Sequence, residues 1–185
     1  PPQKEGIKRF AIQFLVNVSS NEAAYQANHV VVGKMNVCLV QIVKHEWPHN
    51  WPDFIPSLIE SGKSNEVICE NNMKIIRLIS EEIFDFSAEQ MTSEKIELLK
   101  GSLTQEFHQI YLLSEFVLLN ATRVQLLKAT LQALQRYATW IPAQYIFDTQ
   151  LLELLVTKFL VAPPYQVETL RCLQEIASVQ FASNY

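Results

Sequence analysis

The segment Ser61-Gly-Lys-Ser64 contains the Gly-Lys-Ser end of a phosphate-binding loop. The complete motif needs another glycine five residues before Gly62, on a loop that follows a strand, so that successive backbone amides can bind phosphate. Position 57 is a serine, and the residues before the segment have the apolar spacing of a helix. The segment therefore does not predict nucleotide binding.

His45 and His49 lie four residues apart, with Glu46 between them. On an uninterrupted helix the two imidazoles would share one face, and the carboxylate could serve as a third zinc ligand. Pro48 interrupts that helix, because proline lacks the backbone N–H and clashes with the preceding turn. The spacing instead favours solvent-facing histidines at a helix end, and it predicts no metal site.

Two further features could suggest catalysis. Glu81 and Glu82, with Asp85 nearby, could be catalytic carboxylates, but adjacent residues on a helix point in different directions and cannot approach one substrate atom. Cys38 lies in the middle of an apolar helix without a neighbouring histidine, so we expect a buried thiol and not a nucleophile. The sequence predicts no catalytic residue and no cofactor.

The composition narrows the class of protein. The chain has 185 residues, of which 49% are hydrophobic and 18% charged, and a net charge of -4 without blocks of like charge. This balance gives no reason to expect nucleic-acid binding or attraction to an anionic membrane. The most apolar stretch, residues 151–162, contains Glu153 and Lys158 and is shorter than a membrane span. The three cysteines form no CxxC pair, which indicates free thiols in a reducing compartment.

Apolar residues recur every three or four positions along almost the whole chain, and only four glycines are available for tight turns. This pattern predicts an all-α fold of eight helices, at about residues 6–19, 28–47, 51–60, 65–84, 92–119, 122–137, 148–160 and 164–179. The helices fall into four antiparallel pairs of HEAT-repeat length, at about 6–47, 51–85, 92–139 and 148–180. One such pair cannot bury its apolar faces alone, so we expect the pairs to stack into a solenoid. A four-helix bundle is the alternative.

Two Trp-Pro pairs, Trp47-Pro48 and Trp51-Pro52, separate the second and third predicted helices. The prolines stop one helix and allow the next to begin, with Pro52 in its first turn. We expect the two indoles to fill a structural corner between stacked pairs. A surface site for an aromatic ligand is the alternative.

Polar residues recur along the second helix of each of the first two pairs, opposite the apolar face. If equivalent helices align in the solenoid, these stripes form one wall, which is where such proteins bind partners. A merely solvated face is the alternative. The candidate contacts are Lys34, Gln41, Lys44, Asn71, Lys74 and Arg77.

Several long runs carry a more specific signal: GKMNVCLVQIVKHEWPHNWPDFIPSLI, CENNMKIIRLISEEIFDFS and the Trp-Ile-Pro of RYATWIPAQYIFDTQLL. They resemble the N-terminal part of the CRM-type nuclear export receptors, the exportin-1 family of the importin-beta (karyopherin) superfamily. The resemblance extends over essentially the whole chain. It implies a segment of a larger HEAT solenoid, with apolar surface exposed where further repeats would stack.

The family resemblance implies a function that residue spacing cannot supply. Such receptors carry cargo with leucine-rich export signals out of the nucleus together with Ran-GTP, and they shuttle between nucleus and cytoplasm through nuclear pore proteins. In the family this region faces Ran, whereas the signal groove and its reactive cysteine lie further along. The resemblance thus implies Ran-GTP as the direct partner, with no nucleic acid and no membrane insertion. A scaffold or an import receptor of the same superfamily is the alternative.

Overall fold

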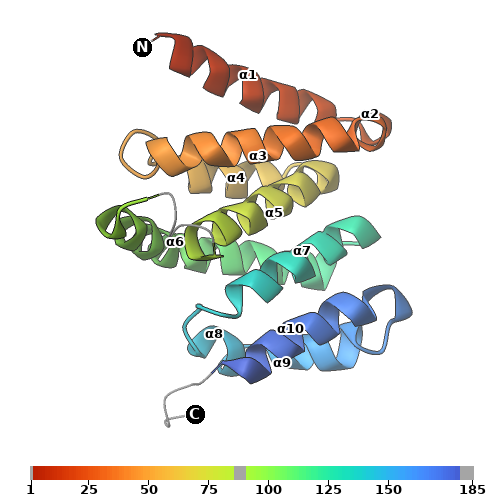
Figure 1. Cartoon of the computed structure of the whole chain (residues 1–185). Helices are drawn as coiled ribbons and strands as arrows, with labels where there is room; N and C mark the ends of the chain where they lie inside the picture. Colours follow the sequence, from red (N-terminus) through yellow and green to blue (C-terminus); the bar gives the residue numbers. More distant parts are fainter. Residues whose placement is uncertain (1, 86–90, 180–185) are drawn as a thin grey trace.

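The computed structural model describes residues 2–85 and 91–179, and these residues form helices and turns without a strand. The helices stack in pairs along one direction, from α1 at one end to α10 at the other (Figure 1). The prediction of an all-α HEAT-repeat solenoid is confirmed. Within the described residues, no helix combines the length and the apolar character that crossing a membrane requires.

The first half of the chain forms two antiparallel pairs, because α1 packs on α3 and α4 packs on α5. The short helix α2 joins α1 to α3, and a π-helical turn, η1, continues α5. The bounds are α1 Pro2–Ser19, α2 Glu22–Ala27, α3 His29–Glu46, α4 Phe54–Gly62, α5 Glu66–Ser80 and η1 Glu81–Asp85.

The second half repeats the arrangement, with α6 packed on α7 and η3 packed on α10. The bounds are α6 Ser93–Asn120, α7 Val124–Tyr137, α8 Gln144–Phe147, α9 Leu151–Leu154, the π-helical η3 Leu155–Phe159, the 3-10 turn η4 Pro163–Tyr165 and α10 Gln166–Ser178. Gln180, the last residue of the fourth predicted pair, lies outside the described residues.

The second helix of each pair packs on the second helix of the next, so α3, α5, α7 and α10 form one continuous layer (Figure 1). We call these four helices the second-helix layer. The first helices α4 and α6 pack on each other behind it. Side chains that point away from the first helices therefore lie side by side along this layer.

The structure contains short elements that the apolar spacing did not predict. Helix α2 occupies residues expected to be a turn, and its N-cap Asn21 accepts a hydrogen bond from the backbone N–H of Ala24 (3.0 Å). The helix expected at 148–160 begins at Leu151 and becomes π-helical, as the bond from Leu160 N–H to the Leu155 carbonyl shows (2.8 Å). Helices of six residues or fewer are too short to show a repeating apolar pattern.

The turn between α3 and α4 contains both Trp-Pro pairs, and its first Trp-Pro peptide bond is cis. Trp47 and Trp51 are buried, whereas Pro52 is exposed. Trp51 packs edge-to-face on Phe54 (4.7 Å between ring centroids), and the Lys8 ammonium of α1 lies 4.3 Å from the Trp51 ring centroid. Helix α4 begins at Phe54, three residues later than predicted, so the prediction that Pro52 lies in its first turn is wrong.

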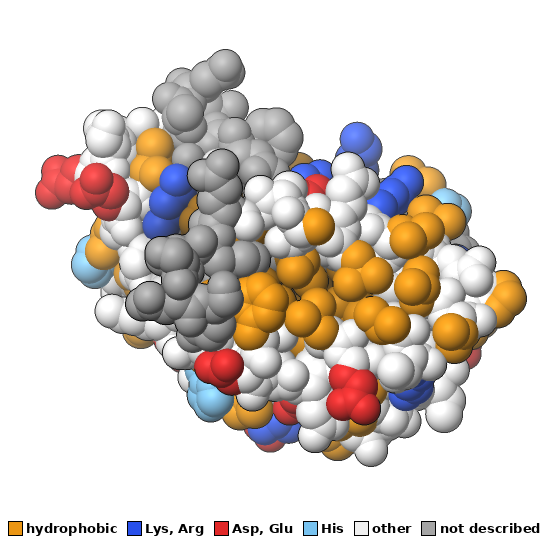
Figure 2. All heavy atoms as spheres, turned by 90° about the horizontal axis from the view of Figure 1, so that it is seen from below, with side chains coloured by type: hydrophobic (Ala, Val, Ile, Leu, Met, Phe, Trp, Pro, Cys, Tyr) orange, Lys and Arg blue, Asp and Glu red, His pale blue; other side chains and the backbone are white. Residues whose placement is uncertain are grey.

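Apolar side chains are exposed at both ends of the stack. Figure 2 looks at the molecule from below, and hydrophobic side chains gather on the face seen there. The exposed apolar residues of η3, α10 and the segment between them are Val156, Val161, Val167 and Leu170. Those of α1 and the start of α3 at the other end are Ile7, Phe10, Val16, Val30 and Val31.

Candidate partner-binding surface

The six predicted contact residues lie on α3 and α5, two neighbouring members of the second-helix layer. Lys34 is exposed on α3. Gln41 is half-buried, in a groove between α1 and α3 that Ile7 and Ile42 also line. The Lys34 side chain is therefore accessible to a partner, and the Gln41 side chain is accessible in part.

Two of the predicted contacts are buried in the layer. Lys44 is 4% exposed, and its ammonium pairs with the Glu82 carboxylate (2.7 Å). Asn71 is 2% exposed and forms a reciprocal amide pair with Asn36, at 2.8 and 3.2 Å. The prediction that all six side chains form exposed stripes is wrong for Lys44 and Asn71, because the contact between α3 and its neighbours covers them.

Lys74 is partly exposed and held in place by two partners. Its ammonium lies 2.6 Å from a Glu70 carboxylate oxygen and donates a hydrogen bond to the Tyr25 hydroxyl (3.0 Å). Burial alone would lower the pKa of Lys74, but the bonds to Glu70 and Tyr25 outweigh burial and the pKa lies above its ordinary value. Lys74 is therefore a fixed positive charge at neutral pH.

Arg77 is also partly exposed, with 33% of its side chain accessible. Its guanidinium donates to the Gln132 carbonyl oxygen on α7 (2.9 Å) and lies 3.5 Å from Glu81, one turn further along the chain. Gln132 and Glu81 thus orient a cation that still faces solvent in part.

Polar pairs of this kind connect every neighbouring pair of helices in the second-helix layer. Between α3 and α5 with η1 they are Asn36–Asn71 and Lys44–Glu82; between α5 with η1 and α7 they are Glu70–Arg123, Arg77–Gln132 and Glu81–Arg136; between α7 and α10 they are Gln135–Glu175 and Lys128–Glu168. Their donor–acceptor distances are 2.7–3.4 Å, except that Lys128–Glu168 is looser at 3.9 Å. The layer is a polar ladder with partly exposed cations on it.

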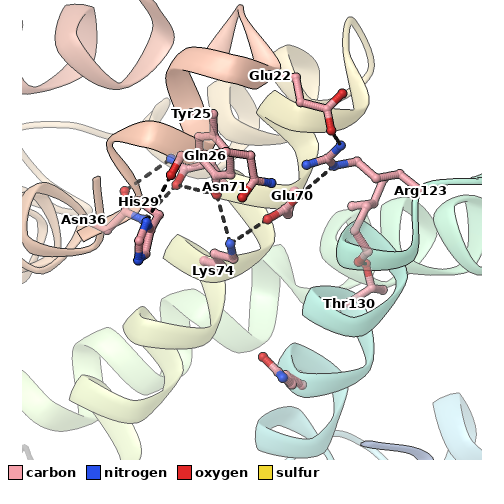
Figure 3. Close-up of polar contacts among 12 residues, drawn as sticks. Glu22, Tyr25, Gln26, His29, Asn36, Glu70, Asn71, Lys74, Arg123 and Thr130 are labelled. Carbon is pink, nitrogen blue, oxygen red and sulfur yellow. Dashed lines mark hydrogen bonds and ion pairs between the residues drawn. The ribbon is translucent and has the colours of Figure 1, made fainter. Parts of the chain in front are cut away.

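Figure 3 shows the network at the start of α5 and α7, where Lys74 and Asn71 lie close to Glu70 and Arg123. Arg123, the N-cap residue of α7, bonds Glu70 of α5 (2.7 Å) and Glu22 of α2. Burial would lower the pKa of Arg123, but the two carboxylates outweigh it and raise the pKa. The sequence shows that Glu70 and Arg123 carry opposite charges, but they are 53 residues apart, and that spacing does not predict that they form a pair.

The three cysteines lie in different environments. Cys69 and Cys172 are buried, and burial raises the pKa of each thiol to about 12, so both stay protonated at neutral pH. Cys38 is exposed on α3, so the prediction that it is buried is wrong. The centre of an apolar helix does not imply burial on every face, because α3 leaves Val31 and Val37 exposed as well.

The geometry defines a protein of the HEAT-repeat class, in which the second-helix layer is the candidate partner surface. A family model described as Exportin 1-like protein matches residues 28–173. The chain belongs to the exportin-1-like family, as the sequence resemblance predicted.

Individual relatives are similar along the whole chain. It is 47% identical to Protein EXPORTIN 1A of Arabidopsis thaliana, and 44% identical to Exportin-1 of Schizosaccharomyces pombe and to Exportin-1 of Drosophila melanogaster. Each alignment covers 183 residues and 99% of this chain. The chain spans 17% of the length of these three relatives.

Proposed function

We propose that this chain is part of a nuclear export receptor that carries cargo with leucine-rich export signals out of the nucleus together with Ran-GTP. The observation that carries the proposal is the exportin-1 similarity, 43–47% identity over nearly the whole chain in relatives from four organisms, one of them a plant, one a yeast and one an insect. In this proposal cargo and nuclear pore proteins bind the longer receptor, which shuttles between nucleus and cytoplasm. The chain itself contributes no catalytic step.

Within that receptor, the second-helix layer forms part of the surface that binds Ran-GTP. Support comes from the partly exposed cations Lys74 and Arg77, which the polar ladder holds in fixed orientations. Lys34 and Gln41 extend the same surface along α3. Lys44 and Asn71 act indirectly, because they hold α3 against its neighbours and are not accessible.

The exposed apolar ends of the stack support the view that the layer continues into further repeats. In a solenoid each repeat covers the apolar face of the next. Val167 and Leu170 of α10, 57% and 55% exposed, would be covered by a following helix pair. The surface for Ran-GTP therefore extends beyond this chain.

The test is equilibrium binding of the 185-residue chain to Ran loaded with a non-hydrolysable GTP analogue and to Ran loaded with GDP. The proposal predicts a preference for the GTP form. Equal binding of the two forms would instead favour a scaffold role or a different partner. Circular dichroism of the same sample shows whether the chain is folded.

Variants of the full-length receptor test the residues. Lys74→Gln and Arg77→Gln remove charge without adding repulsion beside Glu70 and Glu81. Each should weaken Ran-GTP binding at least about tenfold, because losing one charge-assisted hydrogen bond costs ~1.4 kcal/mol or more of binding free energy. The matched control is Lys63→Gln, because Lys63 is exposed and forms a local pair with Glu60, three residues earlier. Unchanged affinity of both variants would remove these two residues from the surface.

A further inference from the structure

One ion-pair cluster joins three helix pairs of the stack (Figure 3). The Arg123 guanidinium bonds the Glu70 carboxylate through Nε (2.7 Å) and the Glu22 carboxylate through Nη1. Glu22 lies on α2 in the first pair, Glu70 on α5 in the second, and Arg123 at the start of α7 in the third. We call Glu22, Glu70 and Arg123 the clamp.

The clamp differs from the other contacts of the layer in its reach. Repeats in a solenoid contact their nearest neighbours, so a change in curvature is spread over many small interfaces. The Glu22–Arg123 pair spans 101 residues and connects the first pair to the third. Bending accumulates along a stack, so the first and third pairs move apart about twice as far as neighbours do. A bond between them therefore resists bending more directly than a bond between neighbours.

The burial of the three side chains gives them different roles. The Glu70 side chain is 2% exposed and that of Arg123 12%, so these two form the buried half of the clamp. The Glu22 side chain is 64% exposed. Its bond can therefore open and close in water without unpairing Glu70 from Arg123, and salt screens it.

We propose that the clamp sets the curvature of the first three helix pairs, and that release of Glu22 from Arg123 lets the second-helix layer open between α3 and α7. The buried pair keeps α5 and α7 together in both states. Lys74, also bonded to Glu70, keeps the cluster electrically balanced while Glu22 is in place. The inference concerns the fold itself and holds whichever partner the surface binds.

The experiment measures the distance from α3 to α7 in the 185-residue chain with a pair of nitroxide labels. Lys34 and Gln125 are exposed on α3 and α7, so Lys34→Cys and Gln125→Cys carry the labels in a Cys38→Ser background. Two helix-to-helix spacings of roughly 9 Å place these sites about 20 Å apart, a distance that pulsed electron paramagnetic resonance can measure.

Charge reversal at Glu22 is the perturbation, with Glu22→Lys as the main variant. It should move the mean distance to a longer value and broaden the distribution. Glu22→Gln should shift it in the same direction by less, since it adds no repulsion toward Arg123. The matched control Glu60→Lys reverses another exposed carboxylate, which pairs only locally with Lys63 at the end of α4, and should leave the distance unchanged.

Salt provides an internal control without any substitution in the clamp. Raising the ionic strength should move the unsubstituted clamp toward the distance of the Glu22→Gln variant and leave that variant where it is. The proposal would be overturned if both Glu22 variants had the same α3–α7 distance as the chain with Glu22 in place, at low and at high salt. Because no Ran is present, this result is independent of the test of export function.

Discussion

Asn71 offers the sharpest test of the structure, since its place on a polar stripe predicted a surface contact and the fold buries it. Asn36 Nδ2 donates to Asn71 Oδ1 (2.8 Å), and Asn71 Nδ2 donates back to Asn36 Oδ1 (3.2 Å). Both side chains are 2% exposed. Asn71→Ala would remove both hydrogen bonds, and also the longer one that the Tyr25 hydroxyl donates to Asn71 Oδ1 (3.5 Å), and leave the Asn36 amide buried without its partner.

The expected cost follows from that unpaired amide. Leaving a buried polar group unsatisfied costs about 1–3 kcal/mol, and the Asn36 amide loses both a donor and an acceptor contact. We expect Asn71→Ala to lower the free energy of unfolding by about 2–4 kcal/mol. Asn36→Ala should cost a similar amount. The double variant should cost less than the sum of the two, with a coupling energy of about 1–3 kcal/mol, because the second substitution removes the orphaned group.

Urea unfolding of the 185-residue chain measures these values. Far-UV circular dichroism and the fluorescence of the three tryptophans should give coincident transitions, which a two-state free energy requires. Gln125→Ala on exposed α7 surface is a control expected to stay within about 0.5 kcal/mol. A loss below about 0.5 kcal/mol for Asn71→Ala, or strict additivity with Asn36→Ala, would refute the buried amide pair.

Three further outcomes follow from the packing. Tyr137→Phe should cost about 1 kcal/mol in urea unfolding, because the fully buried hydroxyl donates to the Ile76 carbonyl (3.1 Å); no loss would argue against that bond. Gly62→Ala should raise the unfolding free energy by about 0.5 kcal/mol, because Gly62 ends helix α4 and an added Cβ would lie 3.5 Å or more from its nearest neighbours; a loss of stability would argue against this helical environment. The thiol pKa values of about 12 for Cys69 and Cys172 lie above the ordinary 9.0, so the folded state keeps protons that the unfolded state loses. The contribution of the two thiols to the free energy of unfolding should be fully present below pH 9 and fall by about 1.4 kcal/mol per pH unit per thiol as the pH rises toward 12. This dependence on pH should be weaker in a Cys69→Ala/Cys172→Ala variant.

The fold was predictable because its information is local. The apolar repeat of each long helix lies within one segment, so the spacing predicted α1, α3, α5, α6 and α7 to within a few residues. The π-helical turns and α2 were not predicted, since each involves few residues. Asn21 before Glu22 is a recognisable N-cap signal, but a cap alone does not predict a helix of six residues.

The candidate surface was less predictable because burial depends on distant residues. Helical periodicity correctly puts Lys74 and Arg77 on an accessible face. It cannot show that Asn36, 35 residues earlier, covers Asn71, or that Glu82 pairs with Lys44 from 38 residues away. A pattern within one helix describes directions around its axis. The neighbouring helix decides which of those directions faces water.

The polar ladder changes how the proposed surface would bind a partner. A free lysine or arginine loses side-chain entropy when it is fixed in an interface, which costs about 0.5–1.5 kcal/mol per side chain. Arg77 has already lost part of that freedom, because Gln132 and Glu81 hold its guanidinium. A guanidinium has five N–H donors, and one bond to Gln132 leaves donors for an acidic partner. The internal pairs of the layer therefore orient Lys74 and Arg77 but also offset part of their charge, since Glu70 and Glu81 are their partners. A partner must match the geometry of the cations' remaining donors as well as their charge.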